Sequence, residues 1–495
     1  MTLNKGSAFF TALVVFFGFG MVCTEVTAQP APASATHTRY RVIFISTFGG
    51  PNNHFAIYGS HILNDDGAFA GWADDSLPDP FPFDCWDGDC YVARGFRWKN
   101  GKMTDLGSLA AGFSSDTSWM SPGGLISGEA QTGLVDPDLG PIMHGTLFVH
   151  GRLIDLGTLD GGAVSLTTSV NDSAEVAGFA VNTIPDPYSM FGTYQTRAYR
   201  WKNGTMTDLG TLGGPDAMAL RINQRGQIAG NSYVNLDSSD PCLLTTGGFL
   251  WENGTMVDLG GFGGSCTLVS DMNNRGEIVG GSFLAGDQAQ HAFLWKRGAM
   301  TDLGASGGNS ASALAINDQG DVVGFQTLPP DGSISHATLW AKRKIFDLGA
   351  LAPDGCSFAQ SVNSHLQVVG INSSDCDFDD DPSLRALISE RGGPVVDLNT
   401  LIPADSGVQL RNASVINEFG EIVAVGVFPD GNHSPVLLVP CHDRESCHND
   451  GMPPRTNYTP SPIEPSAQRS PWAHNWPRVR VKRSFGPTRK IGIPK

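Results

Sequence analysis

The chain has 495 residues, of which 40% are hydrophobic, and its 49 Asp and Glu against 32 Lys and Arg give a net charge of −17. The residues from Cys441 onward carry 10 Lys and Arg against 4 Asp and Glu, so they are basic, and the portion before them has a net charge of −23. A body this acidic repels phosphate, which argues against nucleic-acid binding and leaves the C-terminal residues as the basic region of the chain.

The N-terminal residues have the features of a secretory signal. Lys5 precedes an apolar run over residues 8–22, and small residues then lead to Val26-Thr27-Ala28. This order is typical of a signal peptide, so we expect residues 1–28 to be removed and residues 29–39 to form a short linker. No later stretch reaches the roughly 20 unbroken apolar residues that a membrane-spanning helix needs. The sequence therefore predicts an exported chain without a transmembrane span, located outside the cell, in the periplasm or at the cell surface.

A repeat fills residues 40–440. The tripeptide Asp-Leu-Gly recurs with steps of 50, 53, 50, 44, 45 and 50 residues when a final Asp-Leu-Asn is included. Its aspartates are Asp105, Asp155, Asp208, Asp258, Asp302, Asp347 and Asp397. This period is typical of the blades of a β-propeller. Because an active site needs one special constellation, an aspartate that recurs in each repeat is better explained as a hydrogen-bonding residue of a turn or strand end.

Two turn signals divide each repeat into four strands, which we name a, b, c and d in chain order. Asn317-Asp318-Gln319-Gly320 has Asn first and Gly fourth, as a tight type I turn between strands a and b favours. Asn253-Gly254 stands between two apolar runs and indicates a two-residue hairpin between strands c and d. The first signal occurs eight times, at Asn64, Asn171, Asn223, Asn273, Asn317, Asn363 and Asn417, with a degraded copy near Ser121.

The spacing within the repeats predicts one constant and one variable face. In well-formed copies, the Gly of strand b follows the turn Asn by seven positions, and the Asp of strand d follows the Trp of strand c by seven positions. The stretch from strand b to strand c instead spans 27, 23, 21, 15 and 16 residues in five repeats. In an up-and-down sheet the b-to-c loops and d-to-a links share one face, which we call the variable face. Binding residues usually lie on such loops.

The two ends of the repeat region predict how the fold closes. The last repeat has no strand d, whereas residues 40–50 resemble a strand d that has no preceding strands. Pairing the two would remove exposed sheet edges. The predicted fold is therefore all-β: an eight-bladed β-propeller of four-stranded antiparallel blades, closed by the N-terminal strand. An open β-solenoid of the same units is the alternative, because the period alone does not establish closure.

The cysteines predict a disulfide framework. Nine cysteines minus Cys23 of the signal leave eight, an even number that suits an oxidising compartment. The predicted pairs are Cys85 with Cys90, Cys242 with Cys266, Cys356 with Cys376, and Cys441 with Cys447. The second and third pairs would meet on the variable face. A zinc site built from Cys441, His442, Cys447 and His448 is the alternative for the last pair, and export disfavours it.

Acidic residues of the variable face are the candidate ligand-binding residues. They are Asp84, Asp87, Asp89, Asp136, Asp138, Asp237 and Asp240. The densest run contains Asp375, Asp377, Asp379 and Asp381, whose alternate carboxylates could hold Ca²⁺. The run departs from the calcium-loop pattern, which has Gly where Asp380 stands and Glu where Ala386 stands. A merely solvated acidic surface is therefore the alternative.

One repeat resembles a known family. His291-Ala292-Phe293 is followed by Met300-Thr301-Asp302-Leu303-Gly304 and then by Ala315-Ile316-Asn317, as in the extracellular HAF-repeat family, which is named after the first tripeptide. The resemblance extends over residues 40–439. Other copies read Gly95-Phe96-Arg97 or Arg197-Ala198-Tyr199, so the histidine is not a fixed requirement. The resemblance implies an exported protein and carries no assigned reaction.

These observations favour an exported, non-catalytic binding or interaction module that contacts an extracellular protein or glycan through its variable acidic face. No Gly-x-Ser-x-Gly, His-Glu-x-x-His or phosphate-loop motif is present. The alternatives are a secreted polysaccharide hydrolase or lyase that uses the loop carboxylates, and a structural cell-surface protein. The Pro-rich basic tail, residues 441–495, is predicted to be disordered, and it could contact an anionic envelope polymer or fold back on the acidic face.

Overall fold

The structure is a computed structural model that describes residues 37–55, 61–82, 85–86, 90–149, 151–189, 194–235, 245–305, 310–330, 332–352, 355–376, 378, 383–441 and 447. The chain divides into two compact units, Met1–His37 and Thr38–Lys495, and the elements below all belong to the second. The predicted signal peptide and nearly all of the predicted tail lie outside the described residues.

The described residues form strands almost throughout. There are 32 strands and one short 3-10 helix, η1 (Leu398–Thr400), and no α-helix occurs among the residues described. The all-β prediction is confirmed. The described part of the chain also contains no helix with the length and apolar character needed to cross a membrane.

The strands form six four-stranded sheets and one eight-stranded sheet. The first three sheets contain β2 (Gly49–His54), β3 (Phe69–Pro78), β4 (Tyr91–Lys99) and β5 (Lys102–Asp105); β6 (Trp119–Met120), β7 (Ile126–Asp136), β8 (Gly140–Val149) and β9 (Arg152–Asp155); and β10 (Ser165–Val170), β11 (Val176–Pro185), β12 (Tyr194–Lys202) and β13 (Thr205–Asp208). The eight-stranded sheet contains β14 (Ala217–Ile222), β15 (Ile228–Tyr233), β16 (Thr246–Glu252), β17 (Thr255–Asp258), β18 (Gly263–Met272), β19 (Ile278–Leu284), β20 (Gln290–Lys296) and β21 (Ala299–Asp302).

The last three sheets contain β22 (Ala311–Ile316), β23 (Val322–Thr327), β24 (Ser335–Ala341) and β25 (Lys344–Gly349); β26 (Cys356–Val362), β27 (Gln367–Ser373), β28 (Arg385–Glu390) and β29 (Val396–Asp397); and β30 (Gln409–Ile416), β31 (Ile422–Val427), β32 (His433–Pro440) and β1 (Tyr40–Phe44). We call this last group the terminal sheet. Within each four-stranded sheet the neighbours are antiparallel. In the eight-stranded sheet, a single parallel pair between Thr246 and Cys266 joins two such units.

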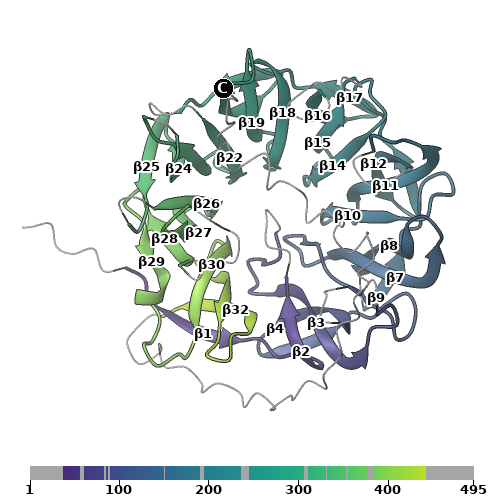
Figure 1. Cartoon of the computed structure of the whole chain (residues 1–495), viewed down its shortest axis with the longest axis horizontal. Helices are drawn as coiled ribbons and strands as arrows, with labels where there is room; N and C mark the ends of the chain where they lie inside the picture. The colour runs from purple at the N-terminus through teal and green to yellow at the C-terminus, as the bar shows by residue number, and fades with distance from the viewer. Residues whose placement is uncertain are drawn as a thin grey trace, which may run out of the picture. The chain divides into compact units, whose positions relative to one another are not determined.

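The terminal sheet combines strands from both ends of the repeat region. β1 pairs antiparallel with β32 in a register that runs from Tyr40 opposite Pro440 to Phe44 opposite Val436. Figure 1 shows the purple β1 beside β32. The segment 40–50 does not form one strand, however, because Gly49 already begins β2 of the first sheet. Gly49 has a φ of 111°, a conformation that glycine adopts readily, where the chain passes from one sheet to the next.

The a strands of successive sheets contact one another, from β10 and β14 through β18, β22 and β26 to β30. Figure 1 shows them nearest the middle of the view, with the sheets following one another around them, as in a β-propeller. Small side chains allow this crowding: Ala217 and Ala219 of β14 pack against Ala177 of the preceding sheet, and all three are fully buried. The repeated tryptophans of strand c, between 5% and 9% exposed, also pack into these layers. The hydrophobic core therefore lies between the facing surfaces of neighbouring sheets.

A chain of asparagine hydrogen bonds connects the sheets at the a-to-b turns. In the turn at Asn273, Oδ1 accepts from the backbone N–H groups of Arg275 and Glu277, and Nδ2 donates to the backbone oxygen of Asn317 in the next sheet. The same inter-sheet bond joins Asn171 to Asn223, Asn223 to Asn273, Asn317 to Asn363, Asn363 to Asn417, and Asn417 to Asn64. The last of these, at 3.0 Å, connects the terminal sheet to the first sheet. Since the groups are buried, each bond satisfies polar atoms that water cannot reach.

Two nearly buried glutamates beside these turns form ion pairs with partly exposed cations. Glu175 lies 2.9 Å from Arg200 and 2.5 Å from Lys202, and its side chain is 6% exposed. Glu277, 3% exposed, pairs with Arg275 at 2.5 Å and with Lys296. Burial is the largest single influence and acts to raise the pKa of both carboxyls, but the hydrogen bonds and charges of their partners together outweigh it, so each pKa lies below its usual range.

These pairs predict an acid-dependent loss of stability. A depressed folded-state pKa contributes stability above the ordinary Glu value of roughly 4.3, and that contribution is lost as the pH falls through the lowered pKa. We expect the free energy of unfolding, measured by urea titration between pH 5 and pH 2, to fall less steeply in Glu175→Gln than in the unaltered protein. Glu252→Gln, on an exposed residue, should keep the original slope. Identical slopes for all three proteins would contradict the ion-pair account.

Candidate binding surfaces

Three consecutive sheets carry elongated hairpins on the variable face. Their b strands β3, β7 and β11 have 10, 11 and 10 residues. The b strands of the other sheets have only 6 or 7 residues. The extra length lies at the strand ends that lead into the b-to-c loops. We call the described residues of these loops, 74–82, 85–86, 90–91, 131–143, 182–189 and 194, together the three-hairpin face.

Exposed apolar side chains gather on the three-hairpin face. Eight large apolar side chains are exposed in the described part of the chain, and five of them belong to these loops. These five are Leu77 (50% exposed), Leu134 (64%), Val135 (57%), Ile184 (53%) and Tyr188 (52%). Single exposed apolar residues are ordinary, whereas a concentration on neighbouring loops indicates an interaction surface.

The same hairpins are acidic. The segments 69–93, 126–149 and 176–194 contain ten Asp and Glu but no Lys or Arg. Asp75, near Leu77, accepts a hydrogen bond of 2.6 Å from the Leu77 backbone N–H. Partial burial raises the pKa of Asp75. Arg94, which follows the first segment, acts on Asp75 in the opposite direction, but the three segments as a whole carry an excess of negative charge, which attracts positively charged partners.

Internal contacts hold the three hairpins in place. Asp79, 4% exposed, accepts hydrogen bonds from the backbone N–H groups of Phe81 and Trp86 at 2.8 Å and 3.3 Å. The hydroxyl of Tyr194 in the third hairpin donates to Asp138 in the second at 2.9 Å. Trp86, Leu139 and Tyr194, one residue from each hairpin, pack against a common buried cluster. The apolar tips therefore project from a supported base.

The structure gives Asp136 and Asp138 a role within one hairpin. Oδ1 of Asp136 accepts from the backbone N–H groups of Asp138 and Leu139 at 2.8 Å and 3.0 Å, which shapes the turn. The bond to Asp138 raises the pKa of the Tyr194 hydroxyl. The other predicted ligand-binding residues, Asp84, Asp87, Asp89, Asp237 and Asp240, lie outside the described residues.

The predicted calcium run is described only in part. Asp375 accepts a hydrogen bond of 2.8 Å from the Ser373 hydroxyl, while Asp377, Asp379 and Asp381 lie outside the described residues. Among the residues that are described, no group of three or more His, Cys, Asp or Glu is placed to hold a metal ion. The calcium site remains a prediction.

Three of the four predicted disulfides are present. Cys85 is bonded to Cys90, Cys356 to Cys376, and Cys441 to Cys447. Cys266 is also disulfide-bonded, and its predicted partner Cys242 lies outside the described residues. The bond between Cys356 and Cys376 joins the first residue of β26, where the d-to-a link ends, to the following b-to-c loop on the variable face.

The repeated aspartates form ion pairs across the c-to-d hairpin. In the β18–β21 unit, Nδ1 of His291 lies 2.8 Å from Asp302, which also accepts from the backbone N–H of Gly304. Equivalent pairs join Arg94 to Asp105, His144 to Asp155, Arg197 to Asp208, and His336 to Asp347. The histidine of the His-Ala-Phe tripeptide is therefore exchangeable with arginine as a partner of the strand-d aspartate. A constant separation of 11 residues was the sequence signal for this pairing, and the sequence interpretation missed it.

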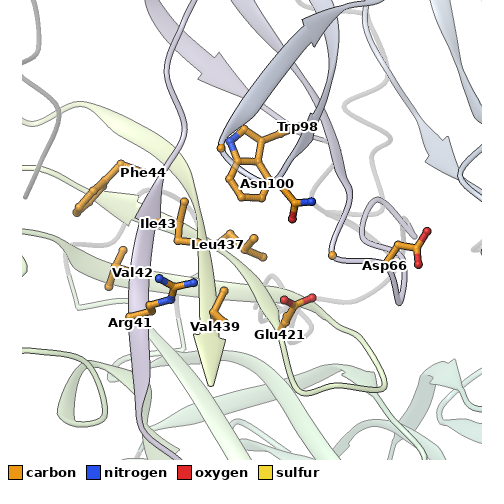
Figure 2. A pocket seen from close by; sticks show the side chains of 12 residues that line it. Arg41, Val42, Ile43, Phe44, Asp66, Trp98, Asn100, Glu421, Leu437 and Val439 are labelled. Carbon is orange, nitrogen blue, oxygen red and sulfur yellow. The ribbon is translucent and has the colours of Figure 1, made fainter. Parts of the chain in front are cut away.

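A cavity of about 470 Å³ lies between the terminal sheet and the first sheet, on the face that carries the tight turns. It is lined by Arg41, Val42, Ile43, Phe44, Asp66, Gly67, Trp98, Asn100, Gly101, Glu421, Leu437 and Val439. Figure 2 shows Arg41 and Glu421 on either side of Val439. In the β10–β13 sheet, Lys202 occupies the position that corresponds to Val439, and it forms an ion pair with Glu175, which corresponds to Glu421. In the terminal sheet, neither Arg41 nor Glu421 has an ion-pair partner within the described residues.

The cavity follows from how the terminal sheet is assembled. Elsewhere a c-to-d hairpin turn caps this edge of the sheet, but β32 and β1 come from opposite ends of the chain and no such turn joins them. The sequence feature that could have predicted this cavity is the absence of an Asn-Gly turn after β32.

A second cluster lies among the a strands. The guanidinium of Arg221 lies 4.7 Å from the ring centre of Trp119 and donates to Asp271 at 2.9 Å. The His61 ring lies 4.5 Å from that of Trp119, and the protein around His61 lowers its pKa by desolvation. The four residues come from four different repeats, so no local sequence pattern could predict their meeting.

Comparison with known proteins found only distant structural similarity. No protein-family model matches the chain, and no curated protein matches it. Dipeptidyl peptidase 4 of Porphyromonas gingivalis aligns with a TM-score of 0.45 and 9% identity over 74% of this chain and 56% of its own. The β-propeller domain of the trilobed protease from Pyrococcus furiosus aligns with a TM-score of 0.40 and 8% identity, over 63% of this chain and 91% of its own. A putative TolB from Agrobacterium tumefaciens aligns with a TM-score of 0.31 and 14% identity, over 50% and 84%.

Proposed function

We propose that the chain is an eight-bladed β-propeller closed by β1, and that it works outside the cell as a binding module. Counting the two units of the eight-stranded sheet separately gives eight four-stranded blades. The pairing of β1 with β32 and the bond from Asn417 to Asn64 support closure. The disulfides and the signal-like N-terminus support an extracellular location.

The binding site that we propose is the three-hairpin face, and its ligand is a polypeptide segment that carries both basic and apolar side chains. The observation behind this proposal is the concentration of exposed apolar tips on the hairpin segments 69–93, 126–149 and 176–194, which contain no Lys or Arg. A basic group would gain from the negative field, and an apolar group would remove the tips from water. The described carboxylates Asp79, Asp136 and Asp138 already bond within the hairpins, which favours binding over a carboxylate-dependent hydrolysis.

A peptide titration tests this function. The probe is a ten-residue peptide of alternating Lys and Leu, with an alternating Glu and Leu peptide as its counterpart. We expect the basic peptide to bind in calorimetry, more weakly as the salt concentration rises, and the acidic peptide not to bind. Equal binding of both peptides, or binding of glycans instead of either, would overturn the proposal.

A pair of substitutions locates the site. Leu134→Ser with Val135→Ser should weaken binding of the basic peptide at least tenfold, because burying one such side chain contributes about 1.5 to 3 kcal/mol. Val257→Ser with Ile345→Ser is the matched control, since these residues are 45% and 39% exposed on β17 and β25, away from the hairpins. Both double variants should unfold within about 0.5 kcal/mol of the original protein. If the control loses as much affinity, the site lies elsewhere.

A further inference from the structure

We propose that the natural occupant of the three-hairpin face is the chain's own C-terminal segment, residues 476–485, which would make the tail an internal competitor for the binding site. The inference rests on the proposed function, because it names what that site takes. The segment reads Trp476-Pro-Arg-Val-Arg-Val-Lys-Arg-Ser-Phe485. In an extended conformation, alternate side chains point to opposite sides, so its basic and apolar groups are interleaved along its length.

Charge complementarity favours this occupant. The residues from Cys441 onward have a net charge of +6, and the portion before them has −23. Four of the ten positive residues of the tail lie within residues 476–485. The three hairpin segments hold ten acidic residues and no Lys or Arg. The apolar residues of the segment, two Val and two aromatic residues, also match a face whose exposed tips are Leu, Val, Ile and Tyr.

The chain between β32 and residues 476–485 is long enough for this segment to reach the three-hairpin face. β32 ends at Pro440, and the backbone N–H of Cys441 donates to Arg39 at 2.8 Å, so the chain leaves from the tight-turn face. Trp476 follows Cys447 by 29 residues, a stretch that spans up to roughly 95 Å when extended. A compact domain of about 400 residues has a radius of gyration of roughly 21 Å, so the segment can reach the opposite face. Tethering of this kind gives a local concentration in the millimolar range.

Occupation by the tail would regulate binding. A peptide from outside must displace the tethered segment, so its apparent affinity falls by the factor by which the segment fills the face. Removal of the tail's charge would release the site without altering the hairpins.

The experiment compares full-length proteins and uses a fluorescent peptide of residues 474–487 as the probe. In the unaltered protein we expect the peptide to bind weakly. In Arg478→Glu/Arg480→Glu/Lys482→Glu, fluorescence anisotropy should show binding at least tenfold tighter. Adding Leu134→Ser/Val135→Ser to that variant should abolish the gain. The charge-matched control Arg455→Glu/Arg469→Glu/Lys495→Glu should bind as weakly as the unaltered protein.

The outcomes separate this inference from the proposed function. If the tail-reversed protein binds the alternating Lys and Leu peptide but not the 474–487 peptide, the three-hairpin face is a binding site that does not take the tail, and the inference fails alone. If it binds neither peptide, the proposed function fails too. A concentration-dependent dimer of the unaltered protein in light scattering, absent from the tail-reversed variant, would overturn occupation within one chain in favour of a second copy. Binding of the peptide to anionic vesicles but not to the protein would also overturn it.

Discussion

Replacing Val42 with Asp is expected to destabilise the protein by about 4 kcal/mol, because the change places an unpaired carboxylate in the apolar layer between the terminal sheet and its neighbour. Val42 is 3% exposed and belongs to the buried cluster that includes Leu438, Ile388 and Leu398. It lies in the middle of β1, opposite Leu438 of β32. The measurement is the free energy of unfolding from a guanidinium titration. The substitution therefore tests whether the N-terminal strand is part of the last sheet.

Val257→Asp provides the control, because Val257 also lies on a d strand, β17, but is 45% exposed. That variant should remain within about 0.5 kcal/mol of the original protein. If Val42→Asp proved as harmless as Val257→Asp, β1 would not be packed in the terminal sheet and the closed ring would be wrong. Self-association of Val42→Asp would agree with the closed ring, since loss of β1 leaves the edge of β32 exposed.

The second large effect is expected from Asn273→Asp, at about 3 kcal/mol of lost stability. Asn273 is 4% exposed, and its Nδ2 donates to the backbone oxygen of Asn317 at 3.0 Å and to Glu277 at 2.8 Å. A carboxylate keeps the acceptor that organises the turn but faces a carbonyl and another carboxylate where the amide donated. The thermal or urea unfolding transition reports the loss.

The pH dependence distinguishes this cause from a general disturbance. Once protonated, the introduced carboxyl group could donate again, so the loss should shrink as the pH is lowered toward about 3. Asn253→Asp serves as the control, because Asn253 lies in an exposed hairpin turn with a φ of 54°, where Asp-Gly is also favourable. If the stability lost in Asn273→Asp were the same at neutral and acidic pH, the loss would not come from the inter-sheet hydrogen bonds.

The sequence predicted the features that local chemistry determines. The Asn-Gly hairpins have positive φ at both residues, as at Asn253 and Gly254, and the a-to-b turns have the expected bond from the Gly320 N–H to the Asn317 oxygen. Spacing also predicted which loops vary, and three of the four predicted cysteine pairs are present. These features follow from a few adjacent residues, so a repeated pattern is enough to reveal them.

The features that depend on several repeats together were not predictable in the same way. The turn asparagines were expected to shape their own turns, but their bonds to the next sheet need the sheets to be placed side by side. The cluster of His61, Trp119, Arg221 and Asp271 draws on four repeats, so it forms only when the four sheets are placed together. The three-hairpin face likewise depends on neighbouring loops extending together, although the longest b-to-c spacings had already pointed to the first repeats.

The pairing of β1 with β32 also has a consequence for how the molecule assembles. Tyr40 finds its partner Pro440 only after 400 further residues have been made. At synthesis rates of about 5 to 20 residues per second, β1 is made roughly 20 to 80 seconds before β32 and stays unpaired during that time. Contacts between residues this far apart in the chain form slowly. Until the final strand pairing, β1 can therefore pair with the free edge strand of another molecule and cause aggregation. A chaperone that covers residues 40–44 during this time would raise the yield of native protein.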